Sequence, residues 1–245
     1  MGDDLIGYLE GTSGHDGPLQ PLASVTLGAP IPEPRKVIGV GRNYREHARE
    51  LGNEAPTEPV LFAKFATSVI GPEEPILIPS AAKQVDYEAE LGVVIGSRAS
   101  EVSAATALEH VAGYTCLNDV SARDLQFPPV QWTRGKAIDT FCPLGPHLVT
   151  RDEIPDPQAL RIRCWLNGEV MQDSSTAEMI FSVADLVSFI SQTITLLPGD
   201  IIATGTPPGV GVARTPPRFL QPGDEVTVEI ERIGRLTNPL RRREA

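Results

Sequence analysis

The residues with the clearest chemical potential in this chain are three acids spaced two apart, Asp86, Glu88 and Glu90. If this stretch is a β-strand, alternate side chains point to one face, about 7 Å apart. Three carboxylates there would repel one another unless a positive charge lay among them. A hard divalent cation such as Mg²⁺ or Mn²⁺ binds oxygen ligands of this kind. The spacing therefore favours a metal site, with a solvated, half-buried edge strand as the alternative.

One strand cannot complete the coordination of such an ion, and Asp119 is the candidate for a further carboxylate. The apolar run 113–117 is typical of a short strand, and Asn118 and Asp119 follow it, where a side chain can reach a site. Ordinary turn formation is the alternative role for these two residues. Ser121 and Asp124 then have the spacing of a capping box, which predicts a helical turn after the strand.

His47 and Glu50 supply a possible general base. They lie three apart in the stretch 44–51, which we expect to be a helix capped by Asn43 and Glu46. Residues three apart share one face of a helix, so the carboxylate can orient the imidazole and stabilise its charge. A surface contact is the common alternative for such a pair, and the nearby candidate metal site favours catalysis.

The elements that must position these groups are mostly strands. From residue 37 onward, short apolar runs alternate with Pro and Gly, and Asn167-Gly168 is typical of a type I′ hairpin turn. The alternation predicts a β-dominated α+β fold. Helices are expected at 44–51, 104–110 and 183–196, and a short strand at 5–10.

Length and composition restrict the class of protein. The 245 residues can bury a full core, and we divide them into a small N-terminal appendage, residues 1–34, and a catalytic domain, residues 35–245. The formal net charge of −11 argues against nucleic acid as a partner. No apolar run approaches the roughly 20 residues that span a membrane, and no signal peptide is recognisable, so we expect a cytoplasmic protein without a membrane partner.

The three cysteines do not indicate a disulfide framework or a metal site. Cys116, Cys142 and Cys164 are odd in number and lack metal-ligand spacing. We expect them to be small hydrophobic residues of the core in a reduced compartment.

Six motifs occur in the order in which they are found in one enzyme family. They are the stretches 40–44, 47–50, 86–91, 118–124, 132–136 and 197–207. Together they resemble the fumarylacetoacetate hydrolase superfamily over about residues 35–239. The chain is most similar to short bacterial acylpyruvate hydrolases, oxaloacetate decarboxylases and relatives acting on 5-carboxymethyl-2-hydroxymuconate. The resemblance implies a mixed β-sandwich roll and a homodimer.

The resemblance also implies a role for each group of residues. The expected ligands of Mg²⁺ or Mn²⁺ are Glu88, Glu90 and Asp119. The expected catalytic residues are His47 and Glu50, on a lid that closes over substrate, together with Lys136. The expected substrate contacts are Arg42, Tyr44, Arg123, Gln126 and Thr206. Asp86 is expected beside the site rather than among the metal ligands.

The expected substrate is a small anionic 2-keto acid, whose carboxylate and ketone oxygens can share one metal. The expected reaction is hydrolysis of an acylpyruvate at C3–C4 or decarboxylation of an oxaloacetate-like acid, and both would release a pyruvate enolate. Proton shuttling alone would isomerise a 5-carboxymethyl-2-hydroxymuconate-type acid. Dehydration of a 2-keto-3-deoxy sugar acid and a catalytically silent metal-binding module are further alternatives. The apolar stretch 126–131 favours an acyl or unsaturated tail over a small carboxylate.

Overall fold

The computed structural model describes residues 5–7, 20–127 and 131–244, and its main element is a seven-stranded mixed sheet. The strand order is β2-β1-β12-β6-β7-β9-β3. The bounds are β1 Val37–Gly41, β2 Val60–Lys64, β3 Val69–Ile70, β6 Ala89–Ile95, β7 Val111–Asn118, β9 Cys142–Thr150 and β12 Ile201–Ala203. Within the described part of this sheet, the β1–β12 and β3–β9 pairs are parallel and the other pairs are antiparallel.

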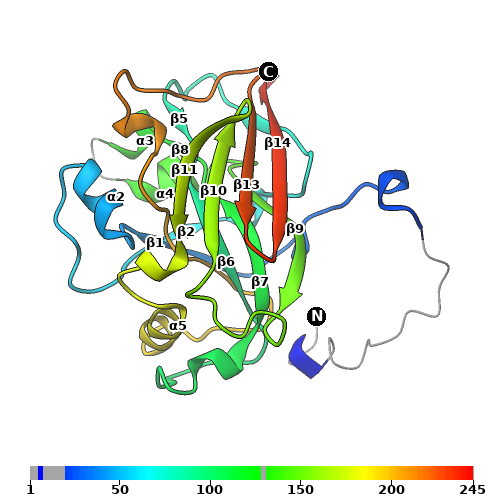
Figure 1. Ribbon diagram of the computed structural model, residues 1–245, viewed down its shortest axis with the longest axis vertical. Helices are drawn as coiled ribbons and strands as arrows, with labels where there is room; N and C mark the ends of the chain where they lie inside the picture. Colours follow the sequence, from blue (N-terminus) through cyan, green and yellow to red (C-terminus); the bar gives the residue numbers. More distant parts are fainter. Residues whose placement is uncertain (1–4, 8–19, 128–130, 245) are drawn as a thin grey trace.

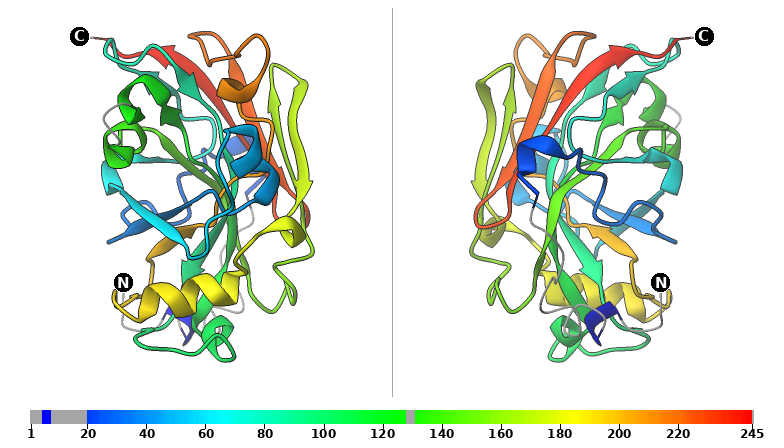
Figure 2. Two further views of the ribbon diagram at one scale, coloured as in Figure 1. Left: turned by 90° about the vertical axis from the view of Figure 1, so that its left-hand side faces the viewer. Right: turned by 90° about the vertical axis from the view of Figure 1, so that its right-hand side faces the viewer.

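A second sheet of five strands packs against the first. Its order is β11-β10-β13-β14-β4. The bounds are β4 Ile76–Ile78, β10 Arg161–Leu166, β11 Glu169–Ser175, β13 Glu225–Ile230 and β14 Gly234–Arg242. Figure 2 shows this sheet, whose strands β10, β11, β13 and β14 are coloured from yellow-green to red, as a layer beside the larger one. A two-stranded ribbon joins β5 (Val85–Asp86) to β8 (Ser121–Ala122). The predicted β-dominated α+β class is confirmed.

The core lies between the two sheets, where β10 and β13 face β6 and β7. Leu91 and Val93 from β6 meet Ile162 from β10 and Val228 from β13, and all four side chains are fully or almost fully buried. Val94 points to the other face of β6 and joins a second apolar cluster. Because β6 is buried on both faces, packing fixes its position from both sides. The position of Glu90, the acidic residue in β6, is therefore fixed as well.

The β10–β11 hairpin turn matches its prediction. Asn167 has a φ of 52° and Gly168 a φ of 82°, as a type I′ turn requires at both central positions. The turn joins β10 directly to β11.

Helices are short and lie on the outside of the sheets (Figure 1). They are α2 (Arg45–Glu50), α3 (Arg123–Gln126), α4 (Trp132–Lys136) and α5 (Val183–Ser191). In Figure 1 the helices α2, α3 and α4 lie on one side of the two sheets. In the described part of the chain, no helix has the length and apolar content that crossing a membrane requires.

Two predicted helices are shorter than expected. The helix predicted at 183–196 begins with a capping box formed by Ser182 and Asp185 but ends at Ser191. Its last predicted turn is lost because the backbone of Leu196 pairs with that of Ala99. The helix predicted at 104–110 is only a 3₁₀ turn, Ala107–His110, because the chain enters β7 at the next residue.

Two predicted helix caps are also wrong. Asn43 does not cap α2, because its amide is bonded to Phe181 and Thr204. Ser121 does not cap α3, because it belongs to β8. Asp124 accepts hydrogen bonds from two backbone amides of the 83–84 segment instead.

Part of the N-terminal segment also differs from its prediction. Residues 5–7 are helical rather than extended, and Leu5 packs into the second apolar cluster. The rest of the predicted strand, residues 8–10, lies outside the described residues. A further 3₁₀ turn spans Leu22–Ser24.

Ile162 offers a test of the core between the sheets. Ile162→Ala should lower the free energy of unfolding by about 2–5 kcal/mol, because it leaves a cavity that the two sheets cannot fill. Val170→Ala on the exposed face of β11 should cost less than about 1 kcal/mol. Urea unfolding of both variants measures the difference, and equal losses would contradict the packing described.

The three cysteines should be inert in the folded protein. All are free and buried, and burial raises the pKa of Cys116 and of Cys142 to about 12 and raises that of Cys164 further. Because the thiolate is the reactive form, an aromatic disulfide reagent should label none of them before unfolding and all three in denaturant. Rapid labelling of the native protein would contradict their placement.

Candidate active site

The three predicted metal ligands converge at the ends of β6 and β7. Glu90 lies in β6, Glu88 immediately precedes it, and Asp119 immediately follows β7. The two strands are antiparallel, and the amide of Asp119 donates to the carbonyl of Glu88 at 2.9 Å. The three side chains are buried, and their ligand oxygens lie within 4.8 Å of one another.

Asp86 does not share a strand face with these acids, contrary to the expectation from its spacing. Strand β5 ends at Asp86 and β6 begins at Ala89, so the intervening backbone breaks the alternation. The backbone N–H of Glu88 stabilises this irregular segment by donating to Asn118 Oδ1 at 3.0 Å. Asp86 instead accepts from Arg123 Nε at 2.9 Å, beside the carboxylate cluster.

Two buried lysines hold Asp119 from opposite sides. Lys136 Nζ lies 2.5 Å from Asp119 Oδ2, 2.8 Å from Glu88 Oε2 and 2.8 Å from Ser121 Oγ. Lys64 Nζ lies 2.6 Å from Asp119 Oδ1. Both oxygens of Asp119 therefore have a cationic partner, and its carboxylate is oriented before any metal binds.

Arg123 forms the third cationic contact of the cluster. Its Nη2 lies 2.9 Å from Asp86 Oδ2 and 2.8 Å from Glu88 Oε1. Its Nη1 donates to Gln126 Oε1 at 3.1 Å. Arg123 thus connects the metal-ligand candidates to a residue predicted to contact substrate.

The pKa values of Glu88 and Glu90 are shifted in opposite directions. Burial disfavours ionisation of Glu88, but Lys136 and Arg123 outweigh it and lower the pKa of its carboxyl. Burial raises the pKa of Glu90 well above its usual range, and the charges of Asp119 and Glu88 raise it further. Glu90 Oε2 accepts a hydrogen bond from the Gly205 amide at 2.8 Å.

The raised pKa of Glu90 points to a cation as its natural partner. Burying a carboxylate without a paired charge is costly, and a divalent ion among Glu88, Glu90 and Asp119 would supply that charge. The donors are three carboxylates, the ligand type that Mg²⁺ and Mn²⁺ prefer. These residues therefore fit a hard divalent cation.

The predicted dyad forms on α2. His47 Nδ1 lies 2.8 Å from Glu50 Oε1, and His47 is 4% exposed. The helix is attached to the fold by Asn43, whose Nδ2 donates to Thr204 O at 2.8 Å and whose Oδ1 accepts from Phe181 N at 2.8 Å. The sequence predicted the pairing of His47 with Glu50 but not these contacts.

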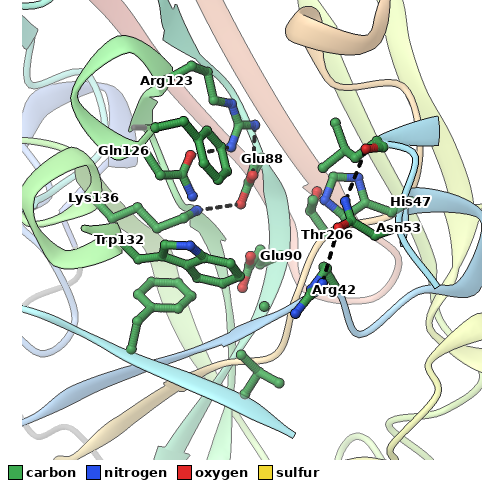
Figure 3. A pocket seen from close by; sticks show the side chains of 15 residues that line it. Arg42, His47, Asn53, Glu88, Glu90, Arg123, Gln126, Trp132, Lys136 and Thr206 are labelled. Atoms are coloured by element: carbon green, nitrogen blue, oxygen red, sulfur yellow. Dashed lines mark hydrogen bonds and ion pairs between the residues drawn. The ribbon is translucent and has the colours of Figure 1, made fainter. Parts of the chain in front are cut away.

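The dyad and the carboxylate cluster face one cavity of about 280 Å³. In Figure 3, His47 and Thr206 lie on one side, Lys136 and Gln126 on the other, and Glu88 and Glu90 between them. The predicted residues that line the cavity are Arg42, His47, Glu88, Glu90, Arg123, Gln126, Lys136 and Thr206. Asp119 and Glu50 contact lining residues from behind.

Two predicted substrate contacts have other surroundings. Tyr44 lies outside this cavity: its backbone pairs with that of Met179, and it lines a separate depression. Thr206 lines the cavity, but its hydroxyl donates to Ala89 O and accepts from Gln172, at 2.9 and 2.8 Å.

The sequence reasoning missed three residues of the site. Lys64 ends the apolar strand β2, and a lysine inside an apolar run was the signal that could have revealed it. Phe62 and Trp132 form an aromatic wall of the cavity, with ring centroids 5.7 Å apart. Arg42 lies over the Trp132 ring at 5.8 Å and adopts a left-handed φ of 58°, as strained residues at functional sites often do.

Comparisons with known proteins identify the family to which this chain is similar. A family described as "Fumarylacetoacetate (FAA) hydrolase C-terminal" matches residues 36–241. The mitochondrial oxaloacetate tautomerase FAHD2A of Bos taurus is 52% identical over 223 residues, which cover 90% of this chain and 71% of that protein.

Solved structures of similar proteins share the fold. A 5-carboxymethyl-2-hydroxymuconate delta-isomerase from Mycobacterium smegmatis is 47% identical with a TM-score of 0.83, covering 94% of this chain and 87% of that one. A 2-hydroxyhepta-2,4-diene-1,7-dioate isomerase from Mycobacterium marinum is 45% identical, also with a TM-score of 0.83, covering 96% of this chain and 84% of that one.

The metal site is testable without any substrate. Glu90→Gln should weaken Mn²⁺ binding by about 100-fold or more, because it removes the carboxylate that lacks a paired cation. Glu169→Gln on the exposed surface and His47→Ala on α2 should both bind Mn²⁺ like the parent protein. Electron paramagnetic resonance of free Mn²⁺ measures the affinities, and unchanged binding by Glu90→Gln would refute the site.

Proposed function

The chain belongs to the fumarylacetoacetate hydrolase family, and from this premise we propose that it is a divalent-metal-dependent tautomerase of oxaloacetate or a closely related 2-keto dicarboxylate. The observation that carries the proposal is the placement of the His47–Glu50 dyad across one small cavity from Glu88 and Glu90. The names of the relatives support it, since they describe a tautomerase and isomerases, enzymes that move a proton within one molecule.

The metal would supply the activation of the substrate. Glu88, Glu90 and Asp119 would hold a divalent cation, which would supply polarisation of the ketone of a 2-keto acid and so acidify the hydrogens at C3. Lys64 and Lys136 hold the two oxygens of the Asp119 carboxylate in place. These two residues thus fix the orientation of one of the three ligand carboxylates.

His47 would perform the proton transfer. With Nδ1 engaged by Glu50 at 2.8 Å, its other ring nitrogen, Nε2, is the one left for substrate. In the direction from ketone to enol, Nε2 takes a proton from C3, and the resulting imidazolium gives that proton, or one exchanged with solvent, to the ketone oxygen. In the reverse direction Nε2 takes the proton of the enol hydroxyl, and the imidazolium delivers a proton to C3. No bond between carbon atoms breaks, and no water molecule is consumed.

Arg42 would recognise the second carboxylate of the substrate. Arg123 and Lys136 already pair with acids of the cluster. Arg42 also lines the cavity, but in the described part of the chain it pairs with no carboxylate and donates only to the Asn53 side chain, at 3.3 Å. An unpaired guanidinium at the cavity favours a dianionic substrate.

The size of the cavity also supports a small acid. About 280 Å³ lies at the lower end of ligand-pocket volumes. The sequence favoured a longer, apolar tail because of the stretch 126–131. Phe127 does line the cavity and is 42% exposed, but residues 128–130 lie outside the described residues. Hydrolysis of acylpyruvates and decarboxylation of oxaloacetate use the same groups and are distinguished by their products.

A product analysis tests the proposal. With Mg²⁺, the protein should accelerate the conversion of enolic to ketonic oxaloacetate, and in heavy water the exchange of C3 hydrogens, without matching formation of pyruvate. His47→Gln should lower kcat by about 10²- to 10⁴-fold, since it removes the proton-transfer group, and should leave Mn²⁺ affinity unchanged. Nuclear magnetic resonance follows enol, ketone and pyruvate together.

Two outcomes would argue against tautomerisation. Pyruvate appearing as fast as C3 exchange would establish decarboxylation as the reaction. Cleavage of acetylpyruvate to acetate and pyruvate, at a higher kcat/KM than any exchange in oxaloacetate, would establish hydrolysis.

A further inference from the structure

A glycine-rich segment donates backbone hydrogen bonds to three separate carboxylates at the site. We call residues 204–212, Thr-Gly-Thr-Pro-Pro-Gly-Val-Gly-Val, the glycine loop. The recorded bonds run from Gly205 N to Glu90 Oε2 (2.8 Å), from Gly209 N to Glu50 Oε2 (2.8 Å), from Gly211 N to Asp86 Oδ1 (2.7 Å) and from Val212 N to Asp86 Oδ2 (3.1 Å). One stretch of backbone therefore holds a metal-ligand candidate and the orienting carboxylate of the dyad.

The contact between Gly209 and Glu50 has a direct chemical consequence for His47. Glu50 uses Oε2 to accept from Gly209 and Oε1 to meet His47 Nδ1, both at 2.8 Å. A carboxylate only accepts hydrogen bonds, so Nδ1 must carry the proton in the neutral ring. Nε2 is then unprotonated and free to act as a base.

Gly209 is itself held firmly. Its carbonyl accepts from Tyr87 Oη at 3.1 Å, and Arg214, which lies against the same carbonyl, donates Nη2 to Met171 O at 2.7 Å. Gly209 has a φ of +107°, and a Cβ there would lie 2.3 Å from the carbonyl oxygen of Met171. A side chain at this position would therefore displace the backbone that carries the amide.

We infer that the Gly209 amide is a positioning group that holds the Glu50 carboxylate against Nδ1 of His47 and thereby fixes the tautomer of His47. The use of Nε2 as the base rests on the proposed function. The tautomer itself does not, because it is a property of the resting protein.

Glu50→Gln tests the inference sharply, because the amide of glutamine has one accepting and one donating end. The Gly209 N–H can face only the carbonyl oxygen of the new side chain, so the NH₂ group must face His47. His47 must then accept at Nδ1 and carry its proton on Nε2. The expected result is a reversal of the tautomer and a fall in kcat of about 10²- to 10⁴-fold, as for other bases held in the wrong tautomer.

The readout is the ¹⁵N chemical shifts of the histidine ring nitrogens, measured at a pH where the imidazoles are neutral. The chain has four histidines, and the loss of one set of signals in His47→Gln assigns those of His47. If Glu50→Gln keeps the proton on Nδ1, the substituted side chain has turned its carbonyl toward His47, the Gly209 amide does not constrain it, and the inference is overturned.

Gly209→Ala provides an independent test, with Gly168→Ala as a matched control. Both glycines have a positive φ, but a Cβ at Gly168 would meet nothing within 4 Å. Gly209→Ala should lower kcat by about 10- to 100-fold and populate both His47 tautomers. Mn²⁺ affinity should be unchanged, since Glu90 is held by a different amide. Gly168→Ala should change neither kcat nor the tautomer.

The outcomes separate this inference from the proposed function. A single unchanged His47 tautomer in Gly209→Ala would overturn the positioning role whatever the reaction is. If the tautomer responds as expected while the parent protein fails to exchange the C3 hydrogens of oxaloacetate, the positioning role stands and the proposed function falls.

Discussion

The structure is organised around buried negative charge that the protein does not fully neutralise. Four buried carboxyl groups, those of Asp86, Glu88, Glu90 and Asp119, lie beside three buried cations, Lys64, Arg123 and Lys136, and Glu90 is the one that forms no ion pair with them. Excess charge in a protein interior is destabilising unless a counter-ion accompanies it. It is tolerated here because β6 is packed on both faces and cannot turn its acid toward solvent. The fold thus favours binding of a cation between Glu88, Glu90 and Asp119.

The two halves of the site are held by different means. The carboxylate half rests on paired strands and buried ion pairs, which break only with the core itself. The dyad half rests on α2, a six-residue helix, and helices this short are not stable alone in water. The geometry of His47 therefore comes from a few tertiary contacts, chiefly those of Asn43 and Glu50. Segments held in this way open most readily.

The spacing of side chains in the sequence predicted the candidate catalytic and metal-binding residues. It did not predict the residues that hold them in place, because those act through contacts between distant parts of the chain. The two-residue spacing of Glu88 and Glu90 and the three-residue spacing of His47 and Glu50 were visible because a strand or helix turns such spacing into proximity. Asn43 was misread as a helix cap because its partner, Phe181, lies far along the chain. The amides of the glycine loop leave no side-chain signature, and Lys64 appeared only as an odd residue in an apolar strand.

The position of β12 in the larger sheet determines when the site can form. β12 lies between β1 and β6, so Val37 pairs with Ile201 on one side and Val94 pairs with the same residue on the other. The strand leading to the dyad and the strand carrying Glu90 therefore stay unconnected through hydrogen bonds until a strand from near the end of the chain is inserted between them. Contacts so distant in sequence slow folding. The glycine loop begins at the residue after β12, so the pairing of this one strand both connects β1 to β6 and places the amides that hold Glu90 and Glu50.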